Sequence, residues 1–472
     1  MPLETDRIRT SVDLRWDADV LPPLQDYIGI PNVSPAFDAD WEANGHMARA
    51  TELVRSWCAA RPVDGMTVDV LELPGRTPVV LCEIPATDPA LAGDTVLLYG
   101  HLDKQPEMAG WREGLGPWTP VLDGDVLYGR GGADDGYSAF AALTAIEALR
   151  EAGGAHARLL VLIEASEESG SPDLPAHLDA LGDRLGEVSL VVALDSGAAT
   201  YDRLWVTTSL RGLLSASVRV DVLTEGVHSG AAGGVVPSSF RILRRLLDRI
   251  EDPDTGRVLL PELHGPIPPE REQQLAATAE QIAGALAFPW AGATHPAQTD
   301  PLAVVRARTW EPAIATIAVD GFPPPDRAGN VLRPFTEVTL ACRLTPTADP
   351  DAAAEALERA LTAAPPHGAT VTVEVQSAEA GWDAPVTAPW LQAAVDEAST
   401  AHWGQPSAAM GEGGSIPFMG LLGARFPEAQ FLITGVLGPG SNAHGPNEML
   451  HLPMARGVTA SVAHVLDAHA RR

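Results

Sequence analysis

Short apolar runs alternate with a helical pattern through the first two hundred residues. Residues 95–100 (TVLLYG), 159–163 (LLVLI) and 190–194 (LVVAL) are almost continuously apolar, which is typical of strands buried on both faces of a parallel sheet. Residues 137–150 place apolar side chains at helical spacing and end shortly before a glycine pair. A similar apolar run returns at residues 431–436. This pattern predicts an α/β sheet that is interrupted and then resumed near the end of the chain.

The stretch between these runs follows a different pattern. Residues 215–224, 337–346 and 369–376 alternate apolar and polar positions, as half-exposed antiparallel strands do. Residues 239–250 and 351–363 have the spacing of amphipathic helices. We therefore expect a small α+β domain inserted into the α/β domain. The expected boundaries are residues 1–208 and 379–472 for the α/β domain and residues 209–378 for the insertion.

Composition narrows the class of protein. The chain has 472 residues, of which 45% are apolar and 20% charged, as in globular proteins. Its 32 basic and 62 acidic residues give a net charge of −30, which argues against binding to nucleic acid because few groups neutralise phosphates. Its three cysteines are widely spaced and odd in number, which excludes a disulfide framework. The opening MPLETDRIRT lacks the apolar region of a signal peptide, and no apolar run suits a membrane helix. We expect a cytoplasmic protein with no membrane or nucleic-acid partner.

Histidines and carboxylates follow three of the predicted strands. His101 and Asp103 come directly after the first strand, Glu167 and Glu168 shortly after the second, and Asp195 directly after the third. Ligands bind at the carboxyl ends of strands in open parallel sheets, so we expect these side chains to converge. Taken singly, each fragment is more often an ordinary surface or core feature.

Two further motifs add ligands of the same kind. Asp134 lies in a glycine-rich turn, GRGGADDG, directly before the predicted helix, and His444 follows the late apolar run. Two histidines with several carboxylates at one sheet edge suit Zn²⁺ or Mn²⁺. The chain has no G-x-G-x-x-G, no P-loop, no H-E-x-x-H and no G-x-S-x-G, so nucleotide binding and serine hydrolysis have little support.

In these motifs the chain resembles the M20 metallopeptidases, a family that includes carnosine-type cytosolic dipeptidases and amino-acid deacylases. The matching motifs span nearly the whole chain. They are YGHLD (99–103), LYGRGGADDG (127–136), EASEESGS (164–171), LDSG (194–197), GVHSG (226–230), EGGSIP (412–417) and AHGPNE (443–448). The implied fold is a mixed, largely parallel sheet flanked by helices, of the zinc-peptidase type, in which the insertion is a lid and dimerisation domain.

The resemblance implies a dinuclear metal centre. Asp134 would bridge two divalent ions, with zinc foremost and manganese or cobalt as alternatives. The full implied ligand set is His101, Asp134, Glu168, Asp195 and His444.

The resemblance also implies roles beyond metal binding. Asp103 would fix the ring of His101 from behind, and Glu167 would be the general base for the metal-bridging water. His228 of GVHSG would reach across a homodimer and stabilise the oxyanion. Substrate carboxylate binding would fall to Gly414, Ser415 and a lid arginine, for which Arg333 is the candidate.

Lys104 departs from the family pattern. It is the only lysine of the chain and directly follows the His-Leu-Asp sequence, where family members mostly carry an apolar residue. Lysine and arginine differ in shape and in titration. We expect Lys104 to contact the substrate or to tune the site.

These features predict a dinuclear metal-dependent hydrolase that cleaves dipeptides or short peptides. Asp195 stands where many carboxypeptidase and deacylase relatives carry glutamate, which favours the dipeptidase branch. The alternative is an N-acyl amino-acid deacylase or carbamoylase that uses the same metals. A non-catalytic dimeric binding protein of the same fold is disfavoured, because every implied ligand and Glu167 are present.

Overall fold

The apolar runs found in the sequence form the centre of one sheet. The structure, a computed structural model, describes residues 4–472. The sheet consists of β1 (Thr67–Leu71), β2 (Val79–Ile84), β3 (Thr95–His101), β6 (Arg158–Glu164), β7 (Val188–Ala193) and β17 (Gln430–Ile433). Their order is β1-β2-β6-β3-β7-β17, and the last four are parallel. β1 pairs antiparallel with β2, and β2 pairs antiparallel with β6. The predicted mixed, largely parallel sheet is confirmed.

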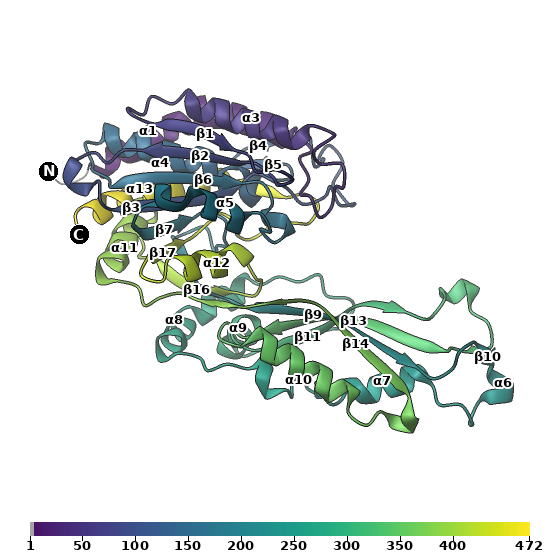
Figure 1. Ribbon diagram of the computed structural model, residues 1–472. Coiled ribbons are helices and arrows are strands. Elements are labelled where there is room, and N and C mark those ends of the chain that lie inside the picture. The colour runs from purple at the N-terminus through teal and green to yellow at the C-terminus, as the bar shows by residue number, and fades with distance from the viewer. Residues whose placement is uncertain (1–3) are drawn as a thin grey trace.

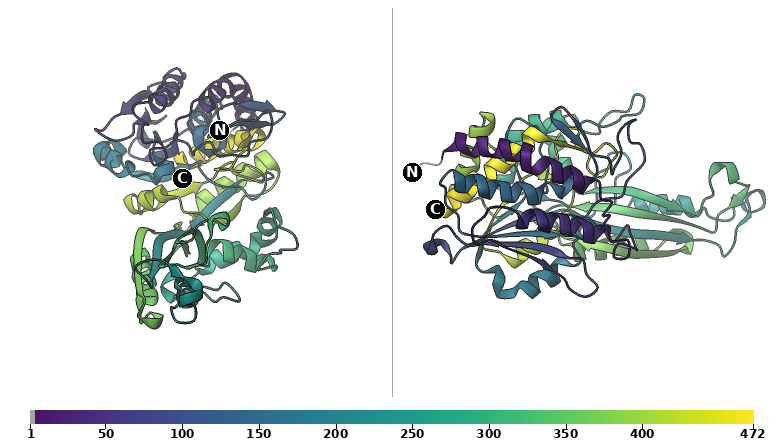
Figure 2. Two further views of the ribbon diagram at one scale, coloured as in Figure 1. Left: turned by 90° about the vertical axis from the view of Figure 1, so that its right-hand side faces the viewer. Right: turned by 90° about the horizontal axis from the view of Figure 1, so that it is seen from above.

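Helices cover both faces of this sheet (Figures 1 and 2). They are α1 (Thr5–Arg15), α2 (Leu21–Ile28), α3 (His46–Ala59), α4 (Ser138–Glu151), α5 (Leu174–Leu181), α11 (Pro389–Trp403), α12 (Pro417–Arg425) and α13 (Leu452–Ala470). On one face, α1, α2, α3, α4, α11 and α13 build the larger core, and α5 and α12 build a smaller core on the other. Because both faces are covered, the central strands β3, β6 and β7 are largely apolar and buried instead of alternating, whereas the edge strand β1 is only partly buried.

The inserted stretch forms a second sheet, which is antiparallel and has four strands. The strands are β9 (Gly212–Asp221), β11 (Ala313–Asp320), β13 (Phe335–Leu344) and β14 (Thr370–Glu379), in the order β11-β13-β9-β14. α7 (Ser239–Leu247) and α10 (Pro350–Thr362) cover one face and share a separate core with it. The alternating pattern of β9 and β13 follows from this single covered face. This body extends from the main sheet as an arm (Figure 1).

One part of the insertion packs differently from the prediction. α8 (Pro269–Ala285) and α9 (Pro301–Thr309) lie within residues 209–378, yet Leu275, Ile282 and Val305 belong to the core of the main body. Arg271 of α8 is buried, and its Nε donates a hydrogen bond of 2.7 Å to Asp383. The segment is continuous in sequence, but its apolar side chains complete the core on the other side of the junction.

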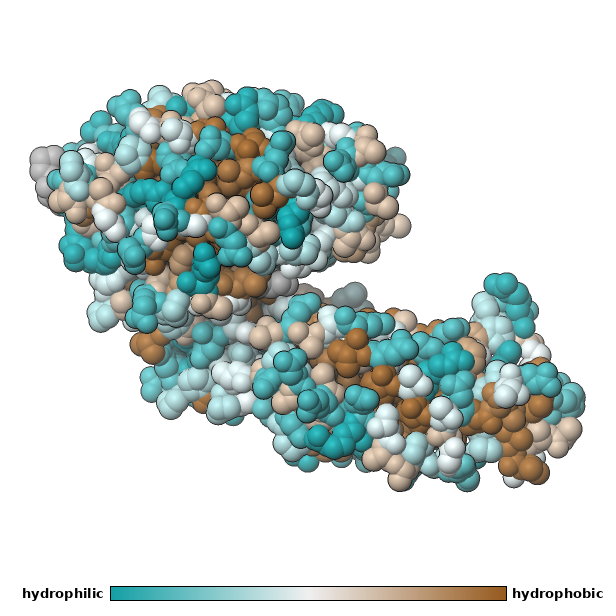
Figure 3. All heavy atoms as spheres, in the orientation of Figure 1, coloured by the Kyte–Doolittle hydropathy of each residue, from teal (hydrophilic) through white to brown (hydrophobic). Residues whose placement is uncertain are grey.

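Short strands join and extend these bodies. In one small sheet, β8 (Trp205–Leu210) pairs with β15 (Trp382–Asp383) and with β16 (Ala408–Glu412). In another, β5 (Val126–Tyr128) pairs with β4 (Val121–Asp123) and with β18 (Met449–His451). At the free end of the arm, β10 (Val227–His228) pairs with β12 (Val331–Leu332) and is followed by α6 (Ser229–Ala232). Figure 3 shows an open notch between the arm and the main body. Among the helices of residues 4–472, none combines the length and apolar character that crossing a membrane requires.

Candidate metal centre

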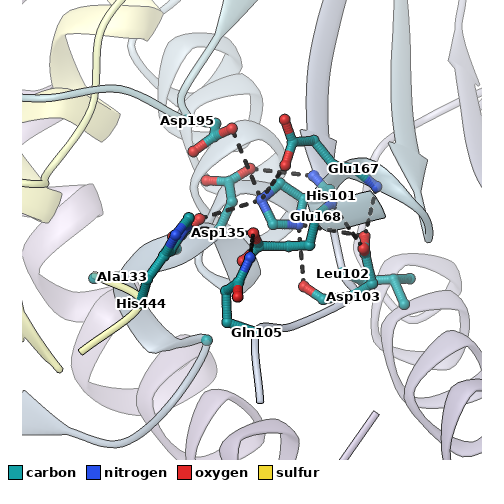
Figure 4. Close-up of polar contacts among 12 residues, drawn as sticks. His101, Leu102, Asp103, Gln105, Ala133, Asp135, Glu167, Glu168, Asp195 and His444 are labelled. Carbon is teal, nitrogen blue, oxygen red and sulfur yellow. Dashed lines mark hydrogen bonds and ion pairs between the residues drawn. The ribbon is translucent and has the colours of Figure 1, made fainter. Parts of the chain in front are cut away.

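The candidate centre lies where the parallel strands of the main sheet end. His101 is the last residue of β3, and its register partner on β6 is Glu164. Glu167 and Glu168 follow β6 in a short turn, and Asp195 lies two residues beyond β7. Neighbouring parallel strands end at the same edge of a sheet, so the structure brings these side chains together (Figure 4).

Asp134 lies between the two histidines that the sequence singled out. Its Oδ1 is 3.3 Å from His101 Nε2, and its Oδ2 is 3.0 Å from His444 Nε2. His444 Nε2 is also 3.3 Å from Glu168 Oε2. The Asp134 side chain is only 7% exposed, whereas that of His444 is 58% exposed, so the cluster opens on the His444 side. A carboxylate that turns one oxygen toward each histidine has the arrangement of a ligand shared by two cations.

The remaining donors surround His101. Its Nε2 lies 3.8 Å from Asp195 Oδ2 and 4.0 Å from Glu167 Oε2. This nitrogen is buried and has no hydrogen-bond partner among the described residues. Donor atoms of His101, Glu167 and Asp195 lie within 4.8 Å of one another, as do those of His101, Asp134 and Glu168. An unpartnered imidazole nitrogen among carboxylate oxygens fits Zn²⁺ or a similar divalent ion.

The charges of the cluster also call for a cation. Burial raises the pKa of Glu167, Asp195 and Glu168, to about 6 for Asp195 and about 8 for Glu168, and neighbouring carboxylates add to this effect. Burial opposes the charge of His444, but its hydrogen bond with Asp134 raises its pKa to about 9. Burial also opposes the charge of Asp134, but its contacts with His101 and His444 hold the pKa of this carboxyl well below its usual range. Divalent ions would supply the positive charge that these carboxylates lack.

Asp103 supports the cluster from behind. Its Oδ1 and Oδ2 accept hydrogen bonds from the backbone N–H groups of Glu167 and Glu168, at 3.1 and 3.0 Å. Its Oδ1 also lies 3.4 Å from His101 Nδ1. On the adjacent turn, Gln105 Nε2 donates a hydrogen bond of 2.6 Å to Glu168 Oε2. Asp103 therefore orients the imidazole and the two glutamates together.

Glu448 and Arg130 form a buried brace that the sequence analysis did not single out. Glu448 Oε2 accepts a hydrogen bond of 2.6 Å from Arg130 Nη1, and its Oε1 accepts from the backbone N–H groups of Gly131 and Asp134, at 2.9 and 3.3 Å. Arg130 Nη2 donates to the carbonyl of Gly445, at 2.8 Å. The brace joins the loop of Asp134 to the loop of His444. Arg130 lies within the motif at residues 127–136 and Glu448 within the motif at residues 443–448, so their places in these motifs could have indicated a role.

The loop of Gly414 and Ser415 adjoins the strand end that carries Asp195. Glu412, at the end of β16, is held by Arg308 Nη2 at 3.2 Å. A Cβ at Gly197 would lie 2.1 Å from Glu412 Oε1, so the residue two positions after Asp195 must be small. The end of β16, directly before the predicted substrate-binding loop, thus contacts the turn that follows Asp195.

Arg343 is a second residue that the sequence analysis missed. It lies on β13, and its Nη1 is buried without a hydrogen-bond partner among the described residues. Burial raises the pKa of Glu379, while Arg343 and a hydrogen bond from Ser415 both lower it. Glu379 therefore lies near both Arg343 and Ser415. The predicted arginine, Arg333, follows β12 at the free end of the arm instead. Arg343 and Arg333 can be told apart only by their positions in the arm: Arg343 lies on β13, and Arg333 directly follows β12.

His228 lies at that free end. It is the last residue of β10, and its Nδ1 accepts a hydrogen bond from the backbone N–H of Gly230 at 3.1 Å. Figure 1 shows β10 at the tip of the arm, beyond the main body. Within residues 4–472 of one chain, no hydrogen bond or ion pair joins His228 to the carboxylate cluster.

Lys104 does not occupy the position expected of a substrate contact. Its side chain is fully buried, and its Nζ donates to the backbone carbonyls of Tyr27 and Ile30, at 2.8 Å each. The expectation of direct substrate contact is therefore wrong, because the ammonium points into the N-terminal segment and away from solvent.

Comparisons with known proteins agree with this geometry. The model of peptidase family M20/M25/M40 matches residues 97–468. The chain is 28% identical over 383 residues to cysteinylglycine-S-conjugate dipeptidase of Corynebacterium striatum, covering 79% of this chain and 82% of the relative. Its fold is similar to that of the dipeptidase Dug1p of Saccharomyces cerevisiae, with a TM-score of 0.76, 20% identity and full coverage of both chains. It is also similar to the metallo-carboxypeptidase Sso-CP2 of Sulfolobus solfataricus, with a TM-score of 0.78, 20% identity and coverage of 96% and 100%.

The brace at Glu448 gives a prediction about stability. Glu448→Gln leaves Arg130 as an unpaired buried charge, so we expect the free energy of unfolding to fall by about 3–5 kcal/mol. Urea denaturation of the purified variant measures this loss. The matched control is Arg184→Ala, which removes a half-exposed cation that pairs with Asp69 and Glu83 and is expected to cost at most about 1 kcal/mol. Equal losses in both variants would contradict the role of the brace.

Proposed function

The chain belongs to peptidase family M20/M25/M40 and is a metallopeptidase, and from this premise we propose that it hydrolyses the amide bond of dipeptides or other short peptides. The observation that carries the proposal is Asp134, which turns one oxygen toward His101 and the other toward His444. This arrangement supports two divalent cations, with zinc foremost, held by these three residues together with Glu168 and Asp195. The dipeptidase activities named for the relatives support a short peptide as substrate.

Glu167 is the proton carrier in this proposal. When bound, the two cations would polarise the scissile carbonyl and lower the pKa of a water molecule. Glu167 removes a proton from the attacking water as the new C–O bond forms, and it returns the proton to the amide nitrogen as the C–N bond breaks. Glu168 is unsuited to this task, because Gln105 and His444 hold its carboxylate. The adjacent glutamates thus divide metal binding and proton transfer between them.

A homodimer would complete the site. His228 stands at the tip of the arm, and apolar side chains are exposed around it: Val235 (84%), Phe322 (49%), Phe240 (45%) and Val331 (40%). Figure 3 shows apolar surface at this end of the arm. Exposed apolar clusters of this kind mark interaction surfaces. We propose that the tip of one subunit docks over the cluster of the other, so that His228 stabilises the oxyanion there and Arg333 arrives beside it.

The carboxylate of the substrate has candidate partners within one chain. Arg343 carries a buried, unpartnered nitrogen, and Ser415 shares Glu379 with it. Burying a charged nitrogen without a partner is unfavourable, which supports an anionic ligand at this position. We propose that Arg343 binds the C-terminal carboxylate together with Gly414 and Ser415.

The three cysteines are free and buried, which supports a reducing compartment such as the cytoplasm.

A substrate panel tests the reaction and the carboxylate site together. We expect the metal-loaded protein to hydrolyse dipeptides faster than N-acetyl or N-carbamoyl amino acids.

We expect Arg343→Met to raise KM for a dipeptide about 10- to 100-fold and to leave KM for its C-terminal amide unchanged, since a lost charged hydrogen bond is worth about 1.5–3 kcal/mol. Preference for N-acyl amino acids would favour the deacylase alternative, and equal effects on acid and amide would contradict the role of Arg343.

The role of Glu167 predicts a separation of activity from metal content. In Glu167→Ala, we expect kcat to fall by at least about 10²–10⁴-fold, because the proton carrier is lost. Metal analysis of the same protein should still give the wild-type content, since Glu167 is not among the proposed ligands. Loss of a cation would show that Glu167 is instead a ligand in the group of His101 and Asp195, whose donor atoms lie close to its own.

The role of His228 across a dimer predicts complementation between two inactive variants. His228→Ala should lower kcat about 10²–10³-fold, as removal of one oxyanion donor does. When His228→Ala and Glu167→Ala chains are co-expressed with different tags, the heterodimer contains one site with both residues intact. We therefore expect activity to return in the doubly tagged fraction. His295→Ala, in an exposed loop, is the control, and its kcat should remain native. No recovery in the heterodimer would contradict the exchange of His228 between subunits.

A further inference from the structure

The side chain of Lys104 ends in a small cage of carbonyl oxygens and aromatic rings, whose size suits an ammonium group. Its Nζ donates to the carbonyl oxygens of Tyr27 (2.8 Å), Ile30 (2.8 Å) and Ile28 (3.4 Å). It lies 3.9 Å from the centre of the Tyr27 ring and 5.5 Å from that of Trp118, both within the range of a cation–π contact. Three acceptors match the three hydrogens of an ammonium. Burial lowers the pKa of Lys104, while the nearby Glu448 carboxylate raises it and Arg130 lowers it further.

The carbonyls that bind Lys104 belong to the C-terminal end of α2 and the turn after it. The last carbonyls of a helix lack intrahelical partners and lie at the negative end of its dipole. A cation at this position therefore caps α2 and holds the turn at residues 28–30. The stem of Lys104 is equally confined, since a Cβ at Gly131 would lie 2.5–2.7 Å from three of its carbon atoms. A planar guanidinium with five donors does not match this cage.

The two neighbours of Lys104 point the other way, toward the metal centre. Asp103 accepts the N–H groups of Glu167 and Glu168, and Gln105 donates to the Glu168 carboxylate. Lys104 itself forms a parallel bridge with Val33, so the backbone here is extended and successive side chains alternate in direction. Fixing the Lys104 side chain therefore fixes the backbone from which Asp103 and Gln105 project.

The N-terminal segment that Lys104 binds also contacts both catalytic loops. Tyr27 Oη donates to the carbonyl of Leu102 at 2.7 Å, and Asn32 Nδ2 donates to the same oxygen at 2.5 Å. Ser34 N donates to the carbonyl of Lys104 at 2.9 Å. Ser34 Oγ lies 2.5 Å from Ser169 Oγ, next to Glu168 in sequence. Residues 27–34 thus connect the loop that follows β3 with the loop that follows β6.

We propose that Lys104 is a positioning residue: its ammonium locks residues 27–34 against the loop that follows His101, and this lock holds Asp103 and Gln105 in place on the two glutamates. The inference rests on the proposed function, because it assigns those glutamates to a metal-dependent site. Its effect is indirect, through the backbone, and Lys104 touches neither substrate nor cation.

Lys104→Met tests this role, since it keeps the length of the stem and removes the charge. We expect the dissociation constant for Co²⁺, measured by chelator competition, to rise about ten- to a hundredfold, as with other residues that orient ligands. We also expect kcat to fall with little change in KM, and a changed Co²⁺ absorption spectrum. Lys104→Arg should not restore any of these values. In the metal-free protein, hydrogen exchange should accelerate at residues 27–34.

Val54→Ala is the control for lost stability alone. Val54 is a buried residue of α3, and this variant should lower the melting temperature while leaving Co²⁺ affinity, spectrum and kcat native. If Lys104→Met lowers only the melting temperature, as Val54→Ala does, Lys104 is purely structural and the proposal is wrong. Asn32→Ala and Ser34→Ala keep Lys104 but cut its links to the loops, so they test the same step if Lys104→Met does not fold. Native Co²⁺ affinity in both would overturn the proposal.

If the proposed function is wrong, the measurements differ from those expected if only the role of Lys104 is wrong. A wild-type protein that binds no divalent ion and hydrolyses no dipeptide would reject that function. Hydrogen exchange in the metal-free Lys104→Met variant would still report whether Lys104 locks residues 27–34. Unchanged exchange there would reject the lock itself, whatever the activity of the wild type.

Discussion

The structure depends on the cost of placing four carboxylates together in a largely buried space. Asp134, Asp195, Glu167 and Glu168 converge around two histidines, and burial disfavours the charged form of all four. Such a cluster is unfavourable unless cations and hydrogen-bond donors compensate for lost hydration. The donors are visible in the chain itself: backbone N–H groups serve the neighbouring carboxylates of Asp103 and Glu448, and the imidazole of His444 serves Asp134. Divalent ions would supply the charge that these donors cannot.

The loops that hold this cluster are braced in pairs. Arg130 and Glu448 join the loop of Asp134 to that of His444, and residues 27–34 join the loop after β3 to that after β6. A ligand displaced by a fraction of an ångström changes the geometry of a metal site, so ligand loops gain from partners that fix their backbone. In the proposed function, the residues that contact the substrate belong instead to the arm and to the Ser415 loop, outside the rigid sheet edge.

Much of the main sheet and the cluster could be predicted, because both follow from short-range patterns. Strands buried on both faces are recognisable as apolar runs, and parallel strands end at a common edge, so His101, Glu168 and Asp195 could be placed together. The proposal of Arg343 as a carboxylate partner was not accessible from the sequence, since it depends on the position of β13 in the arm sheet. The direction of Lys104 was equally inaccessible, because it depends on a contact with α2 some seventy residues earlier. α8 and α9 were misassigned to the arm because continuity in sequence does not determine which core a helix completes.

The two buried cations beside the cluster show how side-chain shape decides the partner. Arg130 presents a planar fork, and it is paired with the carboxylate of Glu448 and with a carbonyl. Lys104 presents a compact ammonium, and it is bound by carbonyl dipoles and ring faces without a carboxylate bonded to it. Arg130 and Glu448 are paired opposite charges, whereas Lys104 Nζ lies close behind the acidic loops among carbonyl oxygens, where burial lowers its pKa. Apart from Lys104, every residue counted among the lysines and arginines of this chain is an arginine, and lysine stands at the one position where a bidentate fork would leave donors unsatisfied. The single lysine is therefore explained by the geometry of its cage, which demands three donors from one atom.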